Sequence, residues 1–355
     1  MRICLFSYRF LPLVGGVQQV SASLAAAWTE MGQSVTLVTT TPLEAGREDF
    51  DGQFRYRVVR LAGEAKEIWK AVLAESDVVV SNGASLKYLM LWKRAGKPVV
   101  LIHTEVIWLA PSAGNPTLME WLCRHAQIRL RRAICRRAAL NVFISKAIAR
   151  NVAVPGGVVI YNPVDPMFSP RVDVPIAADF GFFGRLVGHK GADNLLDALH
   201  LCKSRGHIFT ARLWGEGDEL ERYQGQARRM EIDRQVEFCA FVSGEELVRA
   251  MNSVRVVVVP SKWEEPMGIV AVEAMACGKC VIGSSGGGLG EVLEGYCPTY
   301  PNGDVEQLAQ RMIEAMTRED CRRQCEEAAL RRSGDFEAKH VAGEYLEQFR
   351  RCAAK

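Results

Sequence analysis

Two glutamates eight positions apart, Glu265 and Glu273, are the residues whose type and spacing most strongly suggest chemistry. A run of valines ending at Pro260 predicts a buried strand before them, and Gly268 favours a loop from which a helix begins near Ile269. The carboxylates bracket the amino end of this helix, where backbone N–H groups bind anions. Carboxylates also accept paired hydrogen bonds, which suits the vicinal hydroxyls of a sugar. The pattern indicates a ligand that carries both negative charge and hydroxyl groups.

The predicted helix after Gly268 is apolar on almost every side, which makes Glu273 unusual. Its apolar residues are Val270, Val272, Ala274, Met275 and Ala276. An exposed helical glutamate would be the ordinary interpretation, but this context predicts a buried carboxylate. Because burying an unpaired charge is costly, we expect Glu273 to need a partner.

Two cations, Arg185 and Lys190, flank a glycine-containing loop after another predicted strand. A guanidinium can bind a diphosphate through two N–H groups, and an ammonium adds a compact positive charge. Solvated loop side chains are the alternative interpretation. The flanking glycines and the similar placement of Glu265 after its own strand favour a diphosphate site.

Two features of the amino-terminal half also lie at or after the ends of predicted strands. Gly15 and Gly16 follow the first predicted strand and precede the first helix, so backbone N–H groups there can approach a phosphate or an acceptor. A plain turn is the alternative. His103 ends the fourth predicted strand, at the carboxyl edge where parallel sheets bind ligands. For this residue a structural hydrogen bond is the alternative.

The elements that must position these residues follow an alternating pattern of strand and helix, which predicts parallel sheets covered on both faces. The predicted strands are Arg2–Ser7, Ser34–Thr39, Asp77–Ser81, Pro98–His103, Leu140–Ile144, Asp179–Gly184, Thr210–Trp214, Gln235–Phe238, Arg255–Pro260 and Cys280–Gly283. The predicted helices are Gln18–Met31, Asp193–Arg205, Glu219–Met230, Gly244–Asn252 and Ile269–Cys277, with a helix opening at Glu291 and a charged helical region over Val305–Arg350.

The alternation is interrupted by three prolines, at positions 163, 166 and 170. Proline disrupts helix and sheet interiors, so we place a domain boundary here, with one domain over residues 1–165 and a second over 166–335. The fold class is therefore α/β, with two Rossmann-like, doubly wound parallel-sheet domains. The cleft between them is the expected site, because open parallel sheets bind ligands at the carboxyl ends of their strands.

Six stretches of the chain resemble parts of the family 4 glycosyltransferases, most densely over residues 180–294. The stretch Ser261–Gly278 resembles the family's Glu-x7-Glu signature. Two segments depart from the family pattern, with Ala240 in place of a glycine and Gly290 in place of a proline. The other five stretches are Ile160–Asp165, Phe183–Gly191, Leu213–Gly217, Val236–Phe241 and Gly287–Glu291.

This resemblance implies the GT-B fold, with two domains facing each other across a cleft and the carboxyl-terminal helix, about residues 336–355, packing back on the first domain. It also implies retaining transfer of a hexosyl unit from a nucleotide-diphosphate sugar to a glycan, lipid-linked or small-molecule acceptor, in cell-envelope polysaccharide or glycoconjugate synthesis. We favour a UDP-sugar, with GDP-mannose as the alternative.

In the family, the positions of Arg185 and Lys190 contact the donor diphosphate and offset charge on the leaving group, in place of a metal ion. No metal and no other cofactor is therefore expected. We hypothesise front-face attack in which Glu265 orients sugar hydroxyls and Glu273 the ribose. The expected catalytic residues are Arg185, Lys190, Glu265 and His103. The expected donor-binding residues are Gly15, Gly16, Gly184, Arg185, Lys190, Glu265, Met267, Gly268, Ile269, Val270 and Glu273.

Three other functions compete with transfer. A nicotinamide-dependent dehydrogenase would need a complete glycine fingerprint followed by an acidic residue about 20 positions on, which the sequence lacks; Gly215-Glu216-Gly217 has no third glycine. A sugar-nucleotide epimerase of the same fold would consume donor without forming an acceptor product. A non-catalytic sugar-nucleotide sensor would bind donor and leave it intact.

The composition of the chain argues against several classes of partner and location. The net charge of +3 argues against a nucleic-acid binder. No apolar run reaches the ~20 residues that span a bilayer, and no leader precedes Ile3, so we expect a cytoplasmic protein whose 11 cysteines are reduced. The spaced pair Cys277 and Cys280 is interpreted as packing rather than a metal site, since the nearest other pair, Cys321 and Cys325, lies in an Arg-rich helical stretch.

Two further stretches could suggest ligands. Asp49-Phe50-Asp51 has the spacing of a metal signature known from a different transferase fold, and we interpret it as an ordinary loop. The predicted helix over residues 117–139 is basic and could lie on an anionic membrane at its inner face; a solvated helix face is the equal alternative. Its arginines are Arg124, Arg129, Arg131, Arg132, Arg136 and Arg137.

Overall fold

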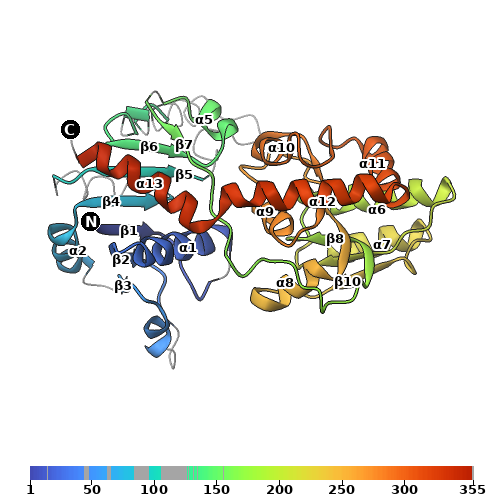
Figure 1. Cartoon of the computed structure of the whole chain (residues 1–355), viewed down its shortest axis with the longest axis horizontal. Coiled ribbons are helices and arrows are strands. Elements are labelled where there is room, and N and C mark those ends of the chain that lie inside the picture. Colours follow the sequence, from blue (N-terminus) through green and yellow to red (C-terminus); the bar gives the residue numbers. More distant parts are fainter. Residues whose placement is uncertain are drawn as a thin grey trace. The chain divides into compact units, whose positions relative to one another are not determined.

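The computed structural model describes residues 1–13, 15–43, 48–61, 65–83, 96–104, 126, 128–130, 132–133, 135–154 and 156–353. The chain divides into two compact units. Unit 1 comprises Met1–Pro163 together with Ala338–Lys355, and unit 2 comprises Val164–Glu337. Each unit is an α/β structure built on its own parallel sheet, as the alternating pattern predicts (Figure 1).

Unit 1 contains a seven-stranded sheet in the order β3-β2-β1-β4-β5-β6-β7, and every strand pair is parallel. Its strands are β1 (Arg2–Ser7), β2 (Ser34–Thr39), β3 (Arg57–Arg60), β4 (Val78–Asn82), β5 (Val99–His103), β6 (Leu140–Phe143) and β7 (Val158–Val159). The helices are α1 (Gly16–Glu30), α2 (Ala65–Glu75), α5 (Lys146–Val152) and α13 (Ala338–Ala353), with a 3-10 helix over Glu48–Gln53. The central strands are buried on both faces, which explains their continuous apolar runs.

Unit 2 contains a six-stranded parallel sheet in the order β10-β9-β8-β11-β12-β13. Its strands are β8 (Ala178–Phe183), β9 (Ala211–Trp214), β10 (Val236–Cys239), β11 (Val254–Val259), β12 (Cys280–Ser284) and β13 (Thr299–Tyr300). Its helices are α6 (Ala192–Ser204), α7 (Leu220–Arg229), α8 (Gly244–Asn252), α9 (Ile269–Ala276), α10 (Gly287–Leu293), α11 (Val305–Thr317) and α12 (Glu319–Ser333), with 3-10 helices over Gly188–Lys190 and Gly334–Phe336. The strand order reverses between β8 and β11, and this switch point is where doubly wound sheets bind ligands.

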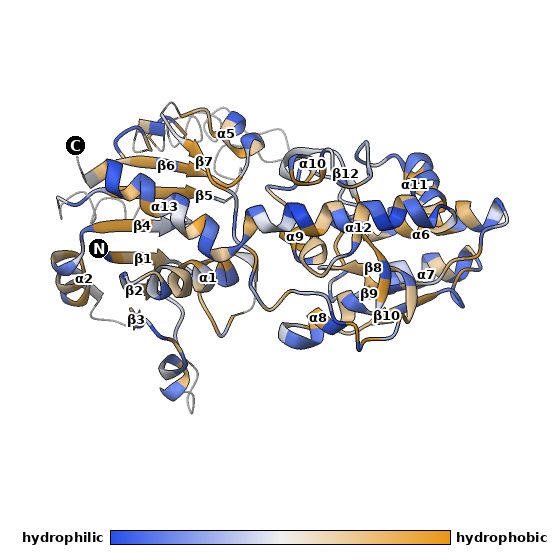
Figure 2. Ribbon diagram, in the orientation of Figure 1, coloured by the Kyte–Doolittle hydropathy of each residue, from blue (hydrophilic) through white to orange (hydrophobic). Residues whose placement is uncertain are grey.

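Hydropathy follows this layering in both units. Figure 2 shows the sheet strands coloured predominantly hydrophobic and the visible face of α12 coloured hydrophilic. Helix α12 buries a narrow stripe, Cys325, Ala329 and Ser333, under an otherwise charged surface. None of the described helices is long and apolar enough to cross a bilayer.

The carboxyl-terminal helix α13 belongs to unit 1 and packs on α1 (Figure 1). The Trp28 ring of α1 is fully buried and lies 5.7 Å from Tyr345 and 5.5 Å from Phe349, centroid to centroid. Its indole Nε1 donates to the Ala342 carbonyl at 3.1 Å. A residue near the start of the chain therefore completes its core with residues more than 300 positions later.

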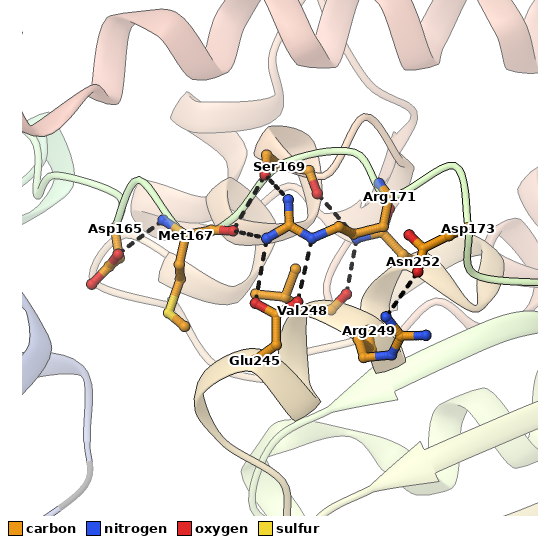
Figure 3. A network of polar contacts seen from close by, with 9 residues as sticks. All are labelled: Asp165, Met167, Ser169, Arg171, Asp173, Glu245, Val248, Arg249 and Asn252. Atoms are coloured by element: carbon orange, nitrogen blue, oxygen red, sulfur yellow. Dashed lines mark hydrogen bonds and ion pairs between the residues drawn. The ribbon is translucent and has the colours of Figure 1, made fainter.

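The segment that opens unit 2 is fixed to α8 by polar contacts (Figure 3). The Arg171 guanidinium contacts both Glu245 carboxylate oxygens at 3.3 Å and donates to the Ser169 hydroxyl at 2.5 Å. The Arg171 backbone N–H donates to Asn252 Oδ1 at 2.8 Å, and Asn252 Nδ2 returns a bond to the Ser169 carbonyl at 3.1 Å. Arg249 donates to Asp173 at 3.0 Å. These bonds make the segment an ordered part of unit 2 rather than a free linker.

Several predicted elements agree with the structure to within a residue, including β1, β2 and α8. The sequence did not indicate β3, β7 or β13, which are edge strands or end strands of two to four residues. The helix predicted to open at Glu291 begins at Gly287 instead. Most of the predicted basic helix 117–139, including Arg124 and Arg131, lies outside the described residues.

Replacement of Trp28 tests how α13 is held. Trp28→Ala removes a fully buried ring and should lower the free energy of unfolding of unit 1 by roughly 3–5 kcal/mol. Trp28→Phe keeps an aromatic ring but loses the bond to Ala342, so it should cost less than the alanine variant. Urea denaturation followed by circular dichroism measures both. Equal, small losses for the two variants would contradict the packing described here.

Candidate functional site

The loops after β8 and β11 meet at the switch point of unit 2 and enclose a pocket of about 80 Å³. Both strands are neighbours in the parallel sheet, so their carboxyl ends lie side by side. Five of the residues predicted for donor binding line this pocket. The full lining is Phe182, Phe183, Lys190, Val258, Val259, Ser261, Glu265, Gly268, Ile269 and Val270.

An ion pair between Lys190 and Glu265 forms the polar wall of the pocket. Lys190 Nζ lies 2.6 Å from Glu265 Oε1, and the Ser261 hydroxyl donates to the same oxygen at 2.6 Å. The Glu265 side chain is 6% exposed and the Lys190 side chain 25% exposed. Burial alone would raise the pKa of Glu265, but the charge of the Lys190 ammonium and the hydrogen bonds from Lys190 and Ser261 outweigh it and hold the pKa below its usual value. Glu265 is therefore an anion whose position is fixed.

Backbone contacts explain the glycines of these loops. A Cβ atom on Gly191 would lie 1.8 Å from the Pro260 carbonyl oxygen, and Gly191 has a φ of +74°. A Cβ atom on Gly217 would lie 2.3 Å from the Leu186 carbonyl oxygen. Leu186 N–H in turn donates to the Glu216 carbonyl at 2.8 Å. The loop after β8 is thus held between the loops after β9 and β11, and side chains at these positions would separate them.

The Gly287-Gly288 turn packs against Glu265 from the other side. Gly288 N–H donates to the Glu265 carbonyl at 2.7 Å, and Gly287 forms an isolated parallel bridge with Glu265. The amide of Gly288 is therefore engaged by the protein. Asn302 braces the same turn, because its Nδ2 donates to the Trp263 carbonyl at 2.9 Å and its Oδ1 accepts from Gly286 N–H at 2.8 Å.

Sequence reasoning missed Asn302, Ser261 and Phe183 as parts of this site. Ser261 and Phe183 lie directly at strand ends, so their position after β11 and at the end of β8 could have indicated them. Asn302 follows a two-residue strand and precedes Gly303, so the sequence presents it as an ordinary turn residue. Phe183 is further held by stacking on Trp214, with ring centroids 4.7 Å apart.

Glu273 lies in α9 and does not line the pocket. Its side chain is half-buried, and no hydrogen bond or ion pair joins its carboxylate to another described residue. Burial, with a smaller contribution from the nearby Asp165 carboxylate, raises the pKa of Glu273 to about 7. The partner that burial was expected to require is absent among the described residues. The carboxylate is instead left able to bond to a hydroxyl from outside the protein.

Arg185, Gly184 and Met267 were also predicted for the site, and these three residues do not line the pocket. The Arg185 side chain is exposed and forms no hydrogen bond or ion pair with a described side chain, so its guanidinium is available to a ligand. Gly184 ends the β8 segment, and its N–H donates to the Trp214 carbonyl at 3.1 Å. Met267 is 2% exposed and belongs to the core. Gly268 caps α9 with a φ of +77°.

In unit 1, His103 ends β5 and is buried. Its Nε2 lies 2.9 Å from Asn141 Oδ1, and Asn141 Nδ2 donates to the Cys135 carbonyl at 2.9 Å. The amide is thereby oriented so that Nε2 carries a proton and Nδ1 is the acceptor of the neutral ring. Burial lowers the pKa of His103, which the Asn141 bond only partly opposes. His103 is therefore a neutral, oriented imidazole.

The glycines of the first loop also occupy the predicted place. Gly15 caps α1, which begins at Gly16 and follows β1. The Gly15 carbonyl accepts from Gln19 N–H at 3.1 Å. The roles expected of Gly15, Gly16 and His103 toward a donor stay predictions.

Of the two aspartates with metal-signature spacing, Asp51 has a structural role. Asp51 forms a salt bridge with Arg60 at 2.7 Å, and Arg60 also donates to the Thr41 and Leu11 carbonyls at 2.8 Å. The carboxylate of Asp51 is therefore committed to holding its own loop. Within the described ranges, no group of three or more histidine, cysteine, aspartate or glutamate side chains is arranged to hold a metal ion.

Two family models match the chain, and each match covers most of one unit. The family model described as glycosyl transferases group 1 matches residues 177–332. The model described as glycosyltransferase family 4 matches residues 14–168. The first match contains the whole sheet of unit 2 and the pocket, and the second contains the strands of unit 1 from β2 to β7.

Curated relatives match a shorter region. An uncharacterized glycosyltransferase of Methanocaldococcus jannaschii is 38% identical over 113 residues, 32% of this chain and 28% of the relative. The D-inositol 3-phosphate glycosyltransferase of Corynebacterium jeikeium is 38% identical over 122 residues, 32% of this chain and 29% of the relative. The matched region thus spans less than a third of either relative.

Among solved structures, the Anabaena protein HepE in complex with UDP has a TM-score of 0.82 at 20% identity, over 99% of this chain and 100% of that one. HepE has also been solved in complex with UDP-glucose. At this identity the likeness establishes the fold, which is GT-B.

The unpaired Glu273 predicts a pH-dependent stability. A carboxyl whose pKa rises from 4.5 to about 7 on folding favours the protonated native state; that advantage is full below pH 4.5 and is lost as the pH rises through 7. Glu273→Gln removes the buried charge, so its gain in unfolding free energy should be roughly 1–3 kcal/mol larger at pH 8 than at pH 5. Urea titrations at the two pH values measure the difference.

The matched control is Glu264→Gln, which changes an exposed carboxylate of the adjacent loop. Its unfolding free energy should follow the wild-type protein at both pH values. A Glu273→Gln variant that does the same would show that Glu273 is not charged at a cost in the folded protein.

Proposed function

Because the chain belongs to the family 4 glycosyltransferases with the GT-B fold, we propose that it transfers a hexosyl unit from a nucleotide-diphosphate sugar, preferentially a UDP-sugar, to a glycan, lipid-linked or small-molecule acceptor. The observation that carries the proposal is the Lys190–Glu265 pair at the switch point of unit 2. Complexes of HepE with UDP and UDP-glucose support a donor of this kind.

The pocket residues divide the work of binding such a donor. Lys190 supplies a positive charge at the pocket wall and Arg185 a guanidinium beside the same loop, and together they offset the charge that develops on the leaving diphosphate. Glu265 Oε1 accepts hydrogen bonds from Lys190 and Ser261. Oε2 receives neither of these bonds, and it orients the sugar hydroxyls by accepting hydrogen bonds from them. Glu273 binds the ribose.

The chemistry that we propose is retaining and independent of a metal ion. The acceptor hydroxyl attacks from the face that the diphosphate leaves, and the departing diphosphate oxygen takes the acceptor proton. The two cations provide the electrostatic stabilisation that a divalent metal ion gives in other transferases. We place the reaction in the cytoplasm or at the inner face of the membrane, within polysaccharide or glycoconjugate synthesis.

Lys190→Ala is the direct test of the cation. It should lower turnover at least about 100-fold, because it removes charge stabilisation made in the transition state. Release of nucleoside diphosphate from the donor sugar, with and without acceptor, measures turnover, and mass spectrometry identifies the glycoside. Donor consumption without a new glycoside would contradict transfer.

A neighbouring lysine provides the matched control. Lys262 pairs with Asp193 at 2.5 Å and does not line the pocket. Lys262→Ala loses a partly exposed ion pair, so it should change turnover by less than about 3-fold. Equal turnover in the two alanine variants would remove Lys190 from the mechanism.

A thermal-shift panel of UDP, GDP, ADP and their sugars tests the donor. A ligand at 100 times its dissociation constant stabilises the folded state by about 2.7 kcal/mol, which raises the melting temperature of a unit of this size by roughly 5–10 °C. UDP and its sugars should give the largest shift in the wild-type protein, and Lys190→Ala should reduce it. Shifts that are equal for all three nucleotides, or unchanged in Lys190→Ala, would count against the site.

A further inference from the structure

Three thiols from separate stretches of unit 2 meet beside the sheet. Cys280 begins β12, Cys297 lies between α10 and β13, and Cys325 lies on α12. The Cys325 sulfur is 3.6 Å from the Cys297 sulfur and also forms a hydrogen bond with the Cys280 thiol. All three are free cysteines in the structure.

The cluster coincides with neither of the two pairs that are closely spaced in the sequence. Cys277 and Cys280 have redox spacing, but Cys277 is buried beside Asn252 and the Ser169 backbone. Cys321 shares α12 with Cys325 but is exposed. The fold therefore takes one thiol from each spaced pair and adds Cys297, which has no cysteine close to it in the sequence.

We propose that Cys297 and Cys325 are an oxidation site that closes reversibly into a disulfide. Their sulfurs need to approach by about 1.5 Å to reach a bond length of about 2.0 Å. No metal-binding group of three or more ligands exists among the described side chains, so the cluster lacks the arrangement of a metal site.

Cys297 is the partner of Cys325 because it is accessible to an oxidant and its backbone is not held in a strand. It is half-buried, whereas Cys280 is 1% exposed. Cys280 is also held by the ladder between β11 and β12, where it pairs with Val256. Cys297 lies in the short connection before β13 and is free of any strand ladder.

The reaction balances with a peroxide as the oxidant. One thiolate donates an electron pair to a peroxide oxygen, the O–O bond breaks, and a sulfenic acid and water form. The second thiolate attacks that sulfur, the S–S bond forms, and hydroxide leaves and is protonated to water. Two thiols are oxidised by two electrons and one hydrogen peroxide is reduced to two waters. Hydrogen bonding with the Cys280 and Cys297 thiols lowers the pKa of Cys325, which favours it as the thiolate that reacts first.

The disulfide would form in a segment whose neighbours in the sequence contact the pocket loops. The Cys297 segment joins α10, whose Gly288 bonds to the Glu265 carbonyl, to β13 and then Asn302. Asn302 bonds to both Trp263 and Gly286. A disulfide would tether this bracing segment to α12. Its effect on donor affinity rests on the proposed function, but formation of the bond does not.

Peptide mapping of the native protein tests the site directly. The protein is treated with hydrogen peroxide, alkylated with N-ethylmaleimide, digested without reductant and analysed by mass spectrometry. We expect a peptide pair linked through Cys297 and Cys325 that disappears on treatment with dithiothreitol. The linked protein should also melt several degrees higher, because the bond closes a loop of 28 positions.

Three single variants sharpen the result. Cys297→Ser and Cys325→Ala should each lose the linked peptide and the rise in melting temperature, and the half-buried Cys297 is the variant less disruptive to the core. Cys321→Ser, which changes the exposed cysteine of α12, should keep both. The proposal is overturned if the wild-type protein yields Cys280 linked to Cys325, sulfinic or sulfonic acids alone, or no linked peptide.

Discussion

A carboxylate that is 6% exposed needs a cation beside it, and in unit 2 this requirement joins two loops that are 75 positions apart in the chain. Lys190 meets Glu265 because β8 and β11 are adjacent parallel strands whose carboxyl ends emerge at one edge of the sheet. The pair gives the pocket a fixed anion and a fixed cation at the same wall. Ligand charge and ligand hydroxyls can therefore be bound by groups that already hold each other in place.

The walls of this site are built largely from backbone packed on backbone. Gly191 lies against Pro260, Gly217 against Leu186, and Gly287 against Glu265. Each contact is possible only because glycine has no side chain. The glycines of these loops therefore allow the loops to pack closely on one another, in addition to any approach to a ligand. Asn302 completes the packing from a turn after the edge strand.

Long apolar runs made the central strands and the α/β class predictable, since strands buried on both faces need no polar alternation. The strands β7 and β13 have only two residues each, which is too short to show a hydrophobic pattern, so the sequence could not predict them. Glu265 and Lys190 were predicted to share a ligand, but sequence spacing could not show that they bond directly. The lone carboxylate of Glu273 was also unforeseen, because a missing partner becomes visible only once every neighbour is placed.

Unit 1 is assembled from both ends of the chain, while unit 2 is one continuous stretch. On the ribosome, the stretch Val164–Glu337 can therefore emerge complete and close its core before α13 exists. Trp28 would remain accessible to solvent until Tyr345 and Phe349 have been synthesised. Vectorial synthesis thus favours a nascent chain whose second unit matures first and whose first unit is the one in need of chaperone protection.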